Sequence, residues 1–89
     1  MAITIETAGQ STLTVTVADS TTTTHTVTVS EEYWQKLSGR RVLPEKLVEK
    51  SFEFLLERES NTSILRTFDL AVIQMYFPDY EKTVRSMLD

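Results

Sequence analysis

The chain of 89 residues has no cysteine, a single histidine, two glycines and two prolines. Without cysteine it forms no disulfide, no thiol nucleophile and no Cys-ligated zinc or iron–sulfur site. One histidine supplies no His cluster for a metal ion or a proton relay. Two isolated glycines supply no phosphate-binding loop and no dinucleotide fingerprint. We therefore expect no metal, no cofactor and no enzyme activity.

Long apolar runs are also absent, since none approaches the ~20 residues that span a bilayer. The first residues, Met-Ala-Ile-Thr-Ile-Glu, lack the basic segment and following apolar segment of a signal peptide. A net charge of −4 and a charged fraction of 25% are ordinary for a globular protein. These features predict a cytoplasmic protein with no membrane partner. The hydrophobic fraction of 40% is enough for one small core.

Composition changes sharply near residue 30. Eleven of the fourteen threonines precede Ser30, whereas all nine Lys and Arg residues lie between Lys36 and Arg85. No Pro-, Gly- or Ser-rich linker separates the two parts. We therefore predict a single domain over residues 1–89, with a β part at 1–30 and an α part at 31–89.

The β part alternates apolar residues with threonine over residues 12–17 and 24–29, which is the period of a half-buried strand. Leu13, Val15 and Val17 share one face, and His25 falls on the matching face of the second strand. Ile3 and Ile5 indicate a further short strand, turned around residues 8–10. The pattern predicts a small antiparallel β-meander of two to three strands.

The α part begins with a helix signal at Ser30, an N-cap residue followed by two acids, and this short helix ends at Gly39. Pro44 starts a long helix that runs to about Ser60. Its apolar residues cover about 200° of its circumference, so it contacts the sheet and something else. Two short helices over 70–77 and 79–88 complete an α+β fold.

Few side chains suggest chemistry. His25 is the only histidine, and no Ser or Cys nucleophile with a known local motif accompanies it, so we interpret it as a structural histidine. One row of the long helix is acidic and is expected to be solvated or to dock a basic partner; it comprises Glu45, Glu49, Glu53 and Glu57. Phe54 lies at the margin of the apolar arc beside Arg58, and this pair is the candidate for a protein contact.

Residues 24–59 run strand, short helix, Gly-Arg-Arg turn and long helix. This order resembles a ribbon-helix-helix unit, the fold of many bacterial repressors and antitoxins. The resemblance implies that strands of two subunits pair, that Thr26 and Thr28 face DNA bases, and that Arg40 and Arg41 lie near phosphate. The first 30 residues contain no Lys or Arg, however, and phosphate neutralisation dominates nucleic-acid affinity.

A second resemblance covers residues 51–81, through Ser-Phe-Glu-Phe-Leu-Leu-Glu-Arg-Glu, Ser-Ile-Leu-Arg, Phe-Asp-Leu and Tyr-Phe-Pro-Asp-Tyr-Glu. This part is similar to the C-terminal half of small uncharacterised bacterial proteins, and it implies no particular activity. We therefore expect a small non-catalytic bacterial interaction module, antitoxin-like, that contacts an unknown protein partner or forms a homodimer. The alternative is a ribbon-helix-helix-like DNA-binding transcriptional regulator.

Overall fold

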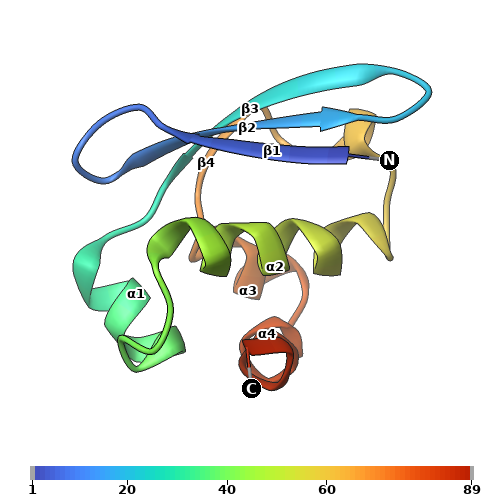
Figure 1. The fold of residues 1–89 in the computed structure, drawn as a ribbon. Helices are drawn as coiled ribbons and strands as arrows, with labels where there is room; N and C mark the ends of the chain where they lie inside the picture. Colours follow the sequence, from blue (N-terminus) through green and yellow to red (C-terminus); the bar gives the residue numbers. More distant parts are fainter. Residues whose placement is uncertain (1, 89) are drawn as a thin grey trace.

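The computed structural model describes residues 2–88, which form a four-stranded mixed sheet with all four helices on one of its faces (Figure 1). The elements in chain order are β1 (Ala2–Thr7), β2 (Thr12–Ala18), β3 (Thr22–Thr28), α1 (Glu31–Ser38), α2 (Pro44–Leu56), the 3₁₀ turn η1 (Asn61–Ser63), β4 (Thr67–Asp69), α3 (Val72–Tyr76) and α4 (Tyr80–Leu88). The predicted α+β class is confirmed. No helix within the described range is long and apolar enough to cross a membrane.

The first three strands form the predicted antiparallel meander, in the order β1-β2-β3. Odd-numbered residues of β2 and β3 are buried beneath the sheet, including Val15, Val17 and Val27. Even-numbered positions, which are mostly threonine, lie on the opposite face. Thr16 pairs with Thr4 on one side and Thr24 on the other, so threonines line up in rows across the strands. Figure 1 shows that, within residues 2–88, no helix covers this threonine face.

β4 is the element that the predicted meander did not include. It pairs in parallel with β3, with Val27 opposite Phe68 and Thr28 opposite Asp69. The sheet is therefore mixed, with four strands rather than two to three antiparallel ones. The segment before β4 strengthens the pairing, because the Thr26 amide donates to the Arg66 carbonyl at 2.7 Å.

The ends of α1 follow the sequence signals. The Ser30 hydroxyl accepts a hydrogen bond from the Tyr33 amide at 3.1 Å, which satisfies one free N–H of the first turn. Gly39 closes the helix in the left-handed conformation, with φ at 61°, and its amide donates to the Gln35 carbonyl. The predicted caps at both ends of this helix are confirmed.

Gly39 provides a first prediction. The Gly39→Ala variant should lose about 1 kcal/mol of unfolding free energy, because a Cβ is disfavoured at φ of 61°. Space is not the cause, since the nearest atom to an added Cβ is the Arg41 side-chain nitrogen at 3.9 Å. Urea unfolding measures the loss, with Gly9→Ala as the control at a glycine without positive φ. Equal losses for both variants would contradict the assignment to backbone strain.

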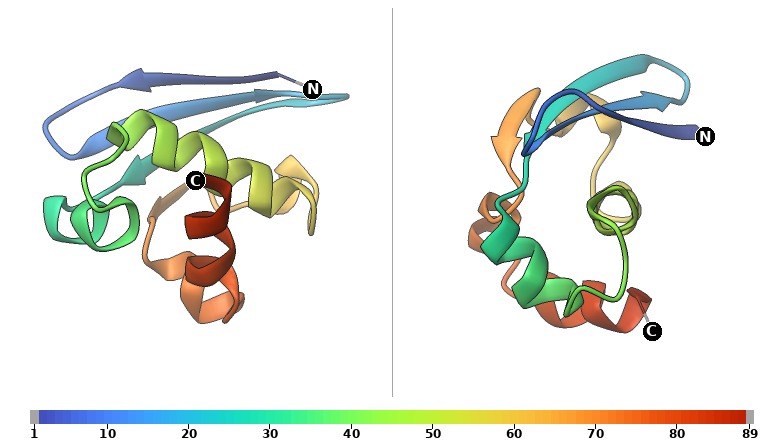
Figure 2. Two further views of the ribbon diagram at one scale, coloured as in Figure 1. Left: turned by 60° about the horizontal axis from the view of Figure 1, so that its bottom comes forward. Right: turned by 60° about the vertical axis from the view of Figure 1, so that its left-hand side comes forward.

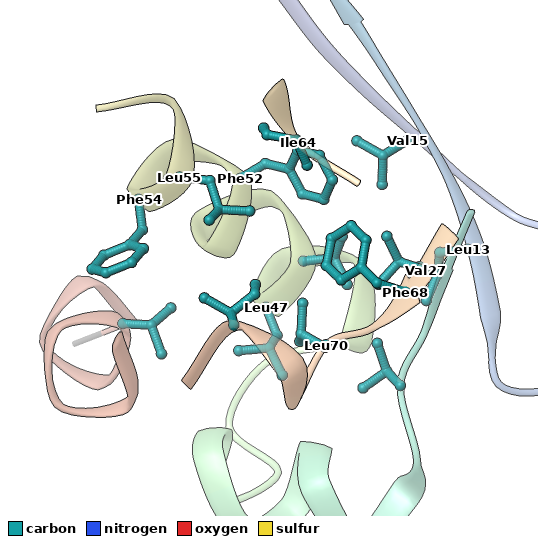
Figure 3. Packing of buried hydrophobic residues seen from close by; sticks show 14 of the residues in the cluster. Leu13, Val15, Val27, Leu47, Phe52, Phe54, Leu55, Ile64, Phe68 and Leu70 are labelled. Atoms are coloured by element: carbon teal, nitrogen blue, oxygen red, sulfur yellow. The ribbon is translucent and has the colours of Figure 1, made fainter. Parts of the chain in front are cut away.

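α2 is the central helix, and it lies between the sheet and α4 (Figure 2). One side packs under the sheet, where the rings of Phe52 and Phe68 lie close together (Figure 3). The Phe52 ring also contacts the His25 ring. The other side packs on α4, where the Ser51 and Tyr80 hydroxyls lie 2.6 Å apart. Burial raises the pKa of the Tyr80 hydroxyl. The wide apolar arc is therefore covered within the chain, and it requires no second subunit.

The C-terminal elements are shorter than predicted. α2 ends at Leu56 instead of near Ser60, and η1 follows it. α3 spans only Val72–Tyr76, and its N-cap is Ala71, without a side-chain cap. Asp69 lies in the turn before it, where its carboxylate accepts from the Ala71 amide at 3.0 Å. Pro78 then separates α3 from α4, as predicted.

Candidate functional site: an apolar pocket between α2, β4 and α3

One pocket of about 430 Å³ opens where the end of α2, the segment leading into β4, and α3 meet. We call it the α2–α3 pocket. Its walls are mostly apolar, and its polar side-chain groups belong to Glu59, Ser63 and the hydroxyl of Tyr76. The apolar lining residues are Leu55, Ile64, Leu65, Phe68, Val72, Ile73, Tyr76 and Phe77. A concave apolar site with a few polar groups is the usual form of a binding site.

The mouth of the α2–α3 pocket exposes large apolar side chains. Leu65 is 50% exposed and Tyr76 is 68% exposed, whereas Ile64 and Ile73 at the base are buried. Met75 on α3 is also exposed, at 79%, but it is not a lining residue of the pocket. Clustered exposed apolar residues around a hollow are typical of an interaction surface, while scattered ones are ordinary.

Glu59 is the one charged residue in the pocket lining. Its side chain is partly buried, and burial raises the pKa of its carboxyl group. Within residues 2–88 no cation forms an ion pair with it. The pocket therefore combines an apolar wall with an uncompensated carboxylate.

A buried polar network attaches the pocket rim to the sheet. His25 Nδ1 lies 2.7 Å from the Leu65 carbonyl oxygen, and His25 Nε2 lies 2.8 Å from the Thr23 hydroxyl. A carbonyl only accepts, so Nδ1 is the donor in the contact with Leu65. The Thr23 hydroxyl oxygen also accepts a hydrogen bond from the side-chain amide nitrogen of Asn61, at 3.0 Å. The network uses both ring nitrogens of the buried His25, in keeping with the structural role expected of this residue, and it fixes the backbone at Leu65.

Phe54 corrects the predicted protein contact. Its side chain is fully buried, with the Phe77 ring at 5.8 Å and the Tyr80 ring at 5.3 Å. α4 and the loop before it cover this margin of α2, so Phe54 belongs to the core and does not reach a partner.

Arg58 caps the buried Phe54 ring, with its guanidinium 3.6 Å from the ring centroid. The same group donates to the Phe54 carbonyl at 3.0 Å and forms an ion pair with Asp79 at 3.4 Å. These three contacts of Arg58 are made within its own chain, and a partner contact at Arg58 stays a prediction.

The residues predicted for DNA are not brought into one surface. Thr26 and Thr28 lie on the threonine face of β3, whereas Arg40 and Arg41 lie in the connection between α1 and α2, on the helical side (Figure 1). Arg40 has φ of 63°, and the Arg41 guanidinium donates to the Ser38 carbonyl at 3.0 Å.

β3 also has both edges paired, with β2 and with β4. A ribbon-helix-helix dimer needs that strand to pair with a second subunit, so the arrangement implied by this resemblance is wrong for this chain.

Comparison of the chain with protein-family models, with curated proteins and with solved structures found no match. Within the described part of the chain, no group of three or more His, Cys, Asp or Glu side chains is placed to hold a metal ion. The α2–α3 pocket, with its mostly apolar walls and exposed mouth, is the candidate binding site.

Sequence reasoning missed Glu59, Leu65 and Tyr76 as site residues. One signal was present: adjacent Ile64 and Leu65 cannot both point inward from an extended segment, since successive side chains alternate. Nothing in the sequence indicates that the outward residue stands at the rim of a pocket, because α3 supplies the opposite wall.

Proposed function

We propose that this protein is a small non-catalytic interaction module that takes an apolar side chain of a partner protein into the α2–α3 pocket. The observation that carries the proposal is the exposed apolar mouth at Leu65 and Tyr76 above a buried apolar base. An anchor side chain in such a pocket is the usual centre of a protein interface.

The charge of the pocket specifies the partner further. An uncompensated Glu59 carboxylate favours a cation, so the anchor residue of the partner stands next to Lys or Arg. A partly exposed ion pair contributes about 0.2–1 kcal/mol, which corresponds to a preference of up to about fivefold. The preference exists while Glu59 is ionised, and it disappears as the pH falls through the raised pKa of this group.

The test uses capped dipeptides as probes, followed by NMR titration of the labelled chain. N-acetyl-Leu-Arg-amide and N-acetyl-Leu-Glu-amide should both shift signals of residues in the pocket, with the Arg peptide binding up to about fivefold more tightly. Glu59→Gln should remove this difference and keep binding of the leucine. Shifts that map elsewhere on the chain would contradict the proposal.

Replacing Leu65 gives a further prediction. Leu65→Ser should weaken both peptides several-fold, because the variant removes apolar contact area at the mouth. The backbone carbonyl that His25 contacts is unchanged, so the fold is expected to persist. Leu43→Ser is the matched control, since Leu43 is 68% exposed and lies outside the pocket. Equal weakening by both variants would show that the peptides bind without using the pocket.

A further inference from the structure

β1 is an edge strand whose only charged residue is Glu6, and it has little other protection against pairing. The order β1-β2-β3-β4 leaves one side of β1 unpaired within the described chain. It contains no Lys, Arg or Pro, and its register with β2 runs without a bulge from Ala2 to Thr7. Natural edge strands usually contain Lys, Pro or a β-bulge, because these features prevent an open edge from pairing with another chain. The opposite edge, β4, is protected by its length of three residues.

The direction of the free backbone groups of β1 follows from the hydrogen bonds at its end. The Ala8 amide donates to the Thr12 carbonyl at 2.9 Å, one step beyond the Thr7–Leu13 pair. Hydrogen-bonded and non-bonded pairs alternate along an antiparallel ladder, so the even-numbered residues of β1 bond to β2. Ile3, Ile5 and Thr7 therefore direct their N–H and C=O groups to the open edge.

The neighbouring ladder agrees with this assignment. The Val29 amide donates to the Ser11 carbonyl at 2.8 Å, next to the Thr12–Thr28 pair. Odd-numbered residues of β2 consequently bond to β3, and its even-numbered residues remain for β1.

The same three residues of β1 place their side chains on the inward, apolar face. Ile3 and Ile5 are only half-buried, and they border a hollow of about 580 Å³ beside α2. Val42 and the 68% exposed Leu43 also line this hollow, and its α2 side carries the charged Glu45, Lys46 and Glu49. The open edge thus offers backbone hydrogen bonds and unburied apolar side chains together.

We infer that β1 pairs antiparallel with β1 of a second copy of this chain, around a two-fold axis at Ile5. When the two-fold axis passes through a residue that faces the open edge, each edge-facing residue of one copy lies opposite an edge-facing residue of the other. Ile5 then lies opposite Ile5 of the second copy, and Ile3 lies opposite Thr7. Each bonded pair exchanges two N–H···O bonds, so the three pairs give about six hydrogen bonds. The result is one continuous eight-stranded sheet with an isologous interface.

The charges and side chains of β1 favour its own copy as the occupant. Its one charged residue, Glu6, falls opposite Thr4 in this register, so no like charges meet across the strands. β-Branched residues meet at the centre, which is a favourable cross-strand combination. The net charge of −4 on each copy opposes association, and salt screens that repulsion.

The first test uses the unaltered chain. Light scattering coupled to size-exclusion chromatography should show the mass rise from 10.2 kDa towards twice that value with concentration, and more readily at high salt. In hydrogen exchange, the Ile3, Ile5 and Thr7 amides should become protected as the dimer forms. The Thr4 and Glu6 amides, already bonded to β2, should be protected in monomer and dimer alike. A monomer up to about 1 mM would overturn the inference, as would a dimer in which the three edge amides exchange freely.

Variants give an independent second test. Ile5→Pro removes an N–H that β2 does not use, and proline is tolerated on an open edge. It should weaken dimerisation at least tenfold while circular dichroism stays that of the folded monomer. Ile5→Ala removes the side chain but keeps the N–H, and it should weaken dimerisation less. If Ile5→Pro dimerises as well as Ile5→Ala does, the interface lies elsewhere; if it unfolds, the exchange pattern of the unaltered chain decides.

Discussion

Phe52→Ala is expected to remove about 3–5 kcal/mol from the free energy of unfolding, the largest single loss that we anticipate for this protein. Phe52 is fully buried where α2 meets the sheet, with its ring centroid 5.4 Å from that of His25 and 6.1 Å from that of Phe68. These neighbours belong to β3 and β4, which are fixed by hydrogen bonds and cannot collapse into the space left behind. The substitution therefore costs the transfer energy of the ring and the energy of a cavity.

A loss of this size is a large part of the total stability of a small domain, which is typically about 5–15 kcal/mol. The melting temperature should fall by at least about 12 °C, given about 4 °C per kcal/mol at this chain length. Calorimetry measures the melting temperature. Tyr76→Ala is the control, because the Tyr76 side chain is 68% exposed, and this variant should lose no more than about 0.5 kcal/mol of unfolding free energy. Comparable losses for the two variants would show that Phe52 is not at the centre of the core.

His25→Ala is expected to have the second largest effect, about 2–5 kcal/mol. The variant removes a fully buried ring and leaves the Leu65 carbonyl and the Thr23 hydroxyl without the partners they have in the network. A buried polar group without a partner costs about 1–3 kcal/mol, in addition to the cavity. In the described chain no buried side-chain nitrogen or oxygen atom lacks a partner, so the variant creates a defect that the native protein avoids.

The location of this effect can be measured by amide exchange. The Thr26 amide donates to the Arg66 carbonyl, beside Leu65, and it should exchange faster in His25→Ala. The Val29 amide donates to Ser11 at the other side of β3 and should change less. Thr24→Ala, on the exposed threonine face, should leave both rates unchanged. Uniform acceleration of the two amides in His25→Ala would instead indicate that the variant only lowers global stability.

The sequence predicted the elements whose signals are local. Period-two alternation over β2 and β3 identifies which valines face the core, and Ser30 and Gly39 mark the ends of α1 because capping involves neighbouring residues only. β4 was missed for the opposite reason. Three residues, Thr-Phe-Asp, are too short to show a period, and the partner strand lies about forty positions earlier in the chain.

The site was harder to predict than the fold. The angular position of Phe54 on α2 places it at the margin of the apolar arc, but whether that margin is open depends on where α4 packs. The α2–α3 pocket likewise exists only because β4 and α3 approach α2 from distant parts of the sequence. Patterns along one element give the face of a side chain, and tertiary packing decides what lies in front of it.

The parallel pairing of β3 with β4 also sets the order in which the chain can fold during synthesis. Loop-closure entropy must be overcome before contacts between distant segments are gained, so such pairings form late. As the chain leaves the ribosome, the β1–β2–β3 meander and α2 emerge well before residues 67–69. Until then the β3 edge is open, and Val27 lacks Phe68 as its neighbour. The nascent intermediate therefore exposes an aggregation-prone strand edge, and the last third of the chain closes it.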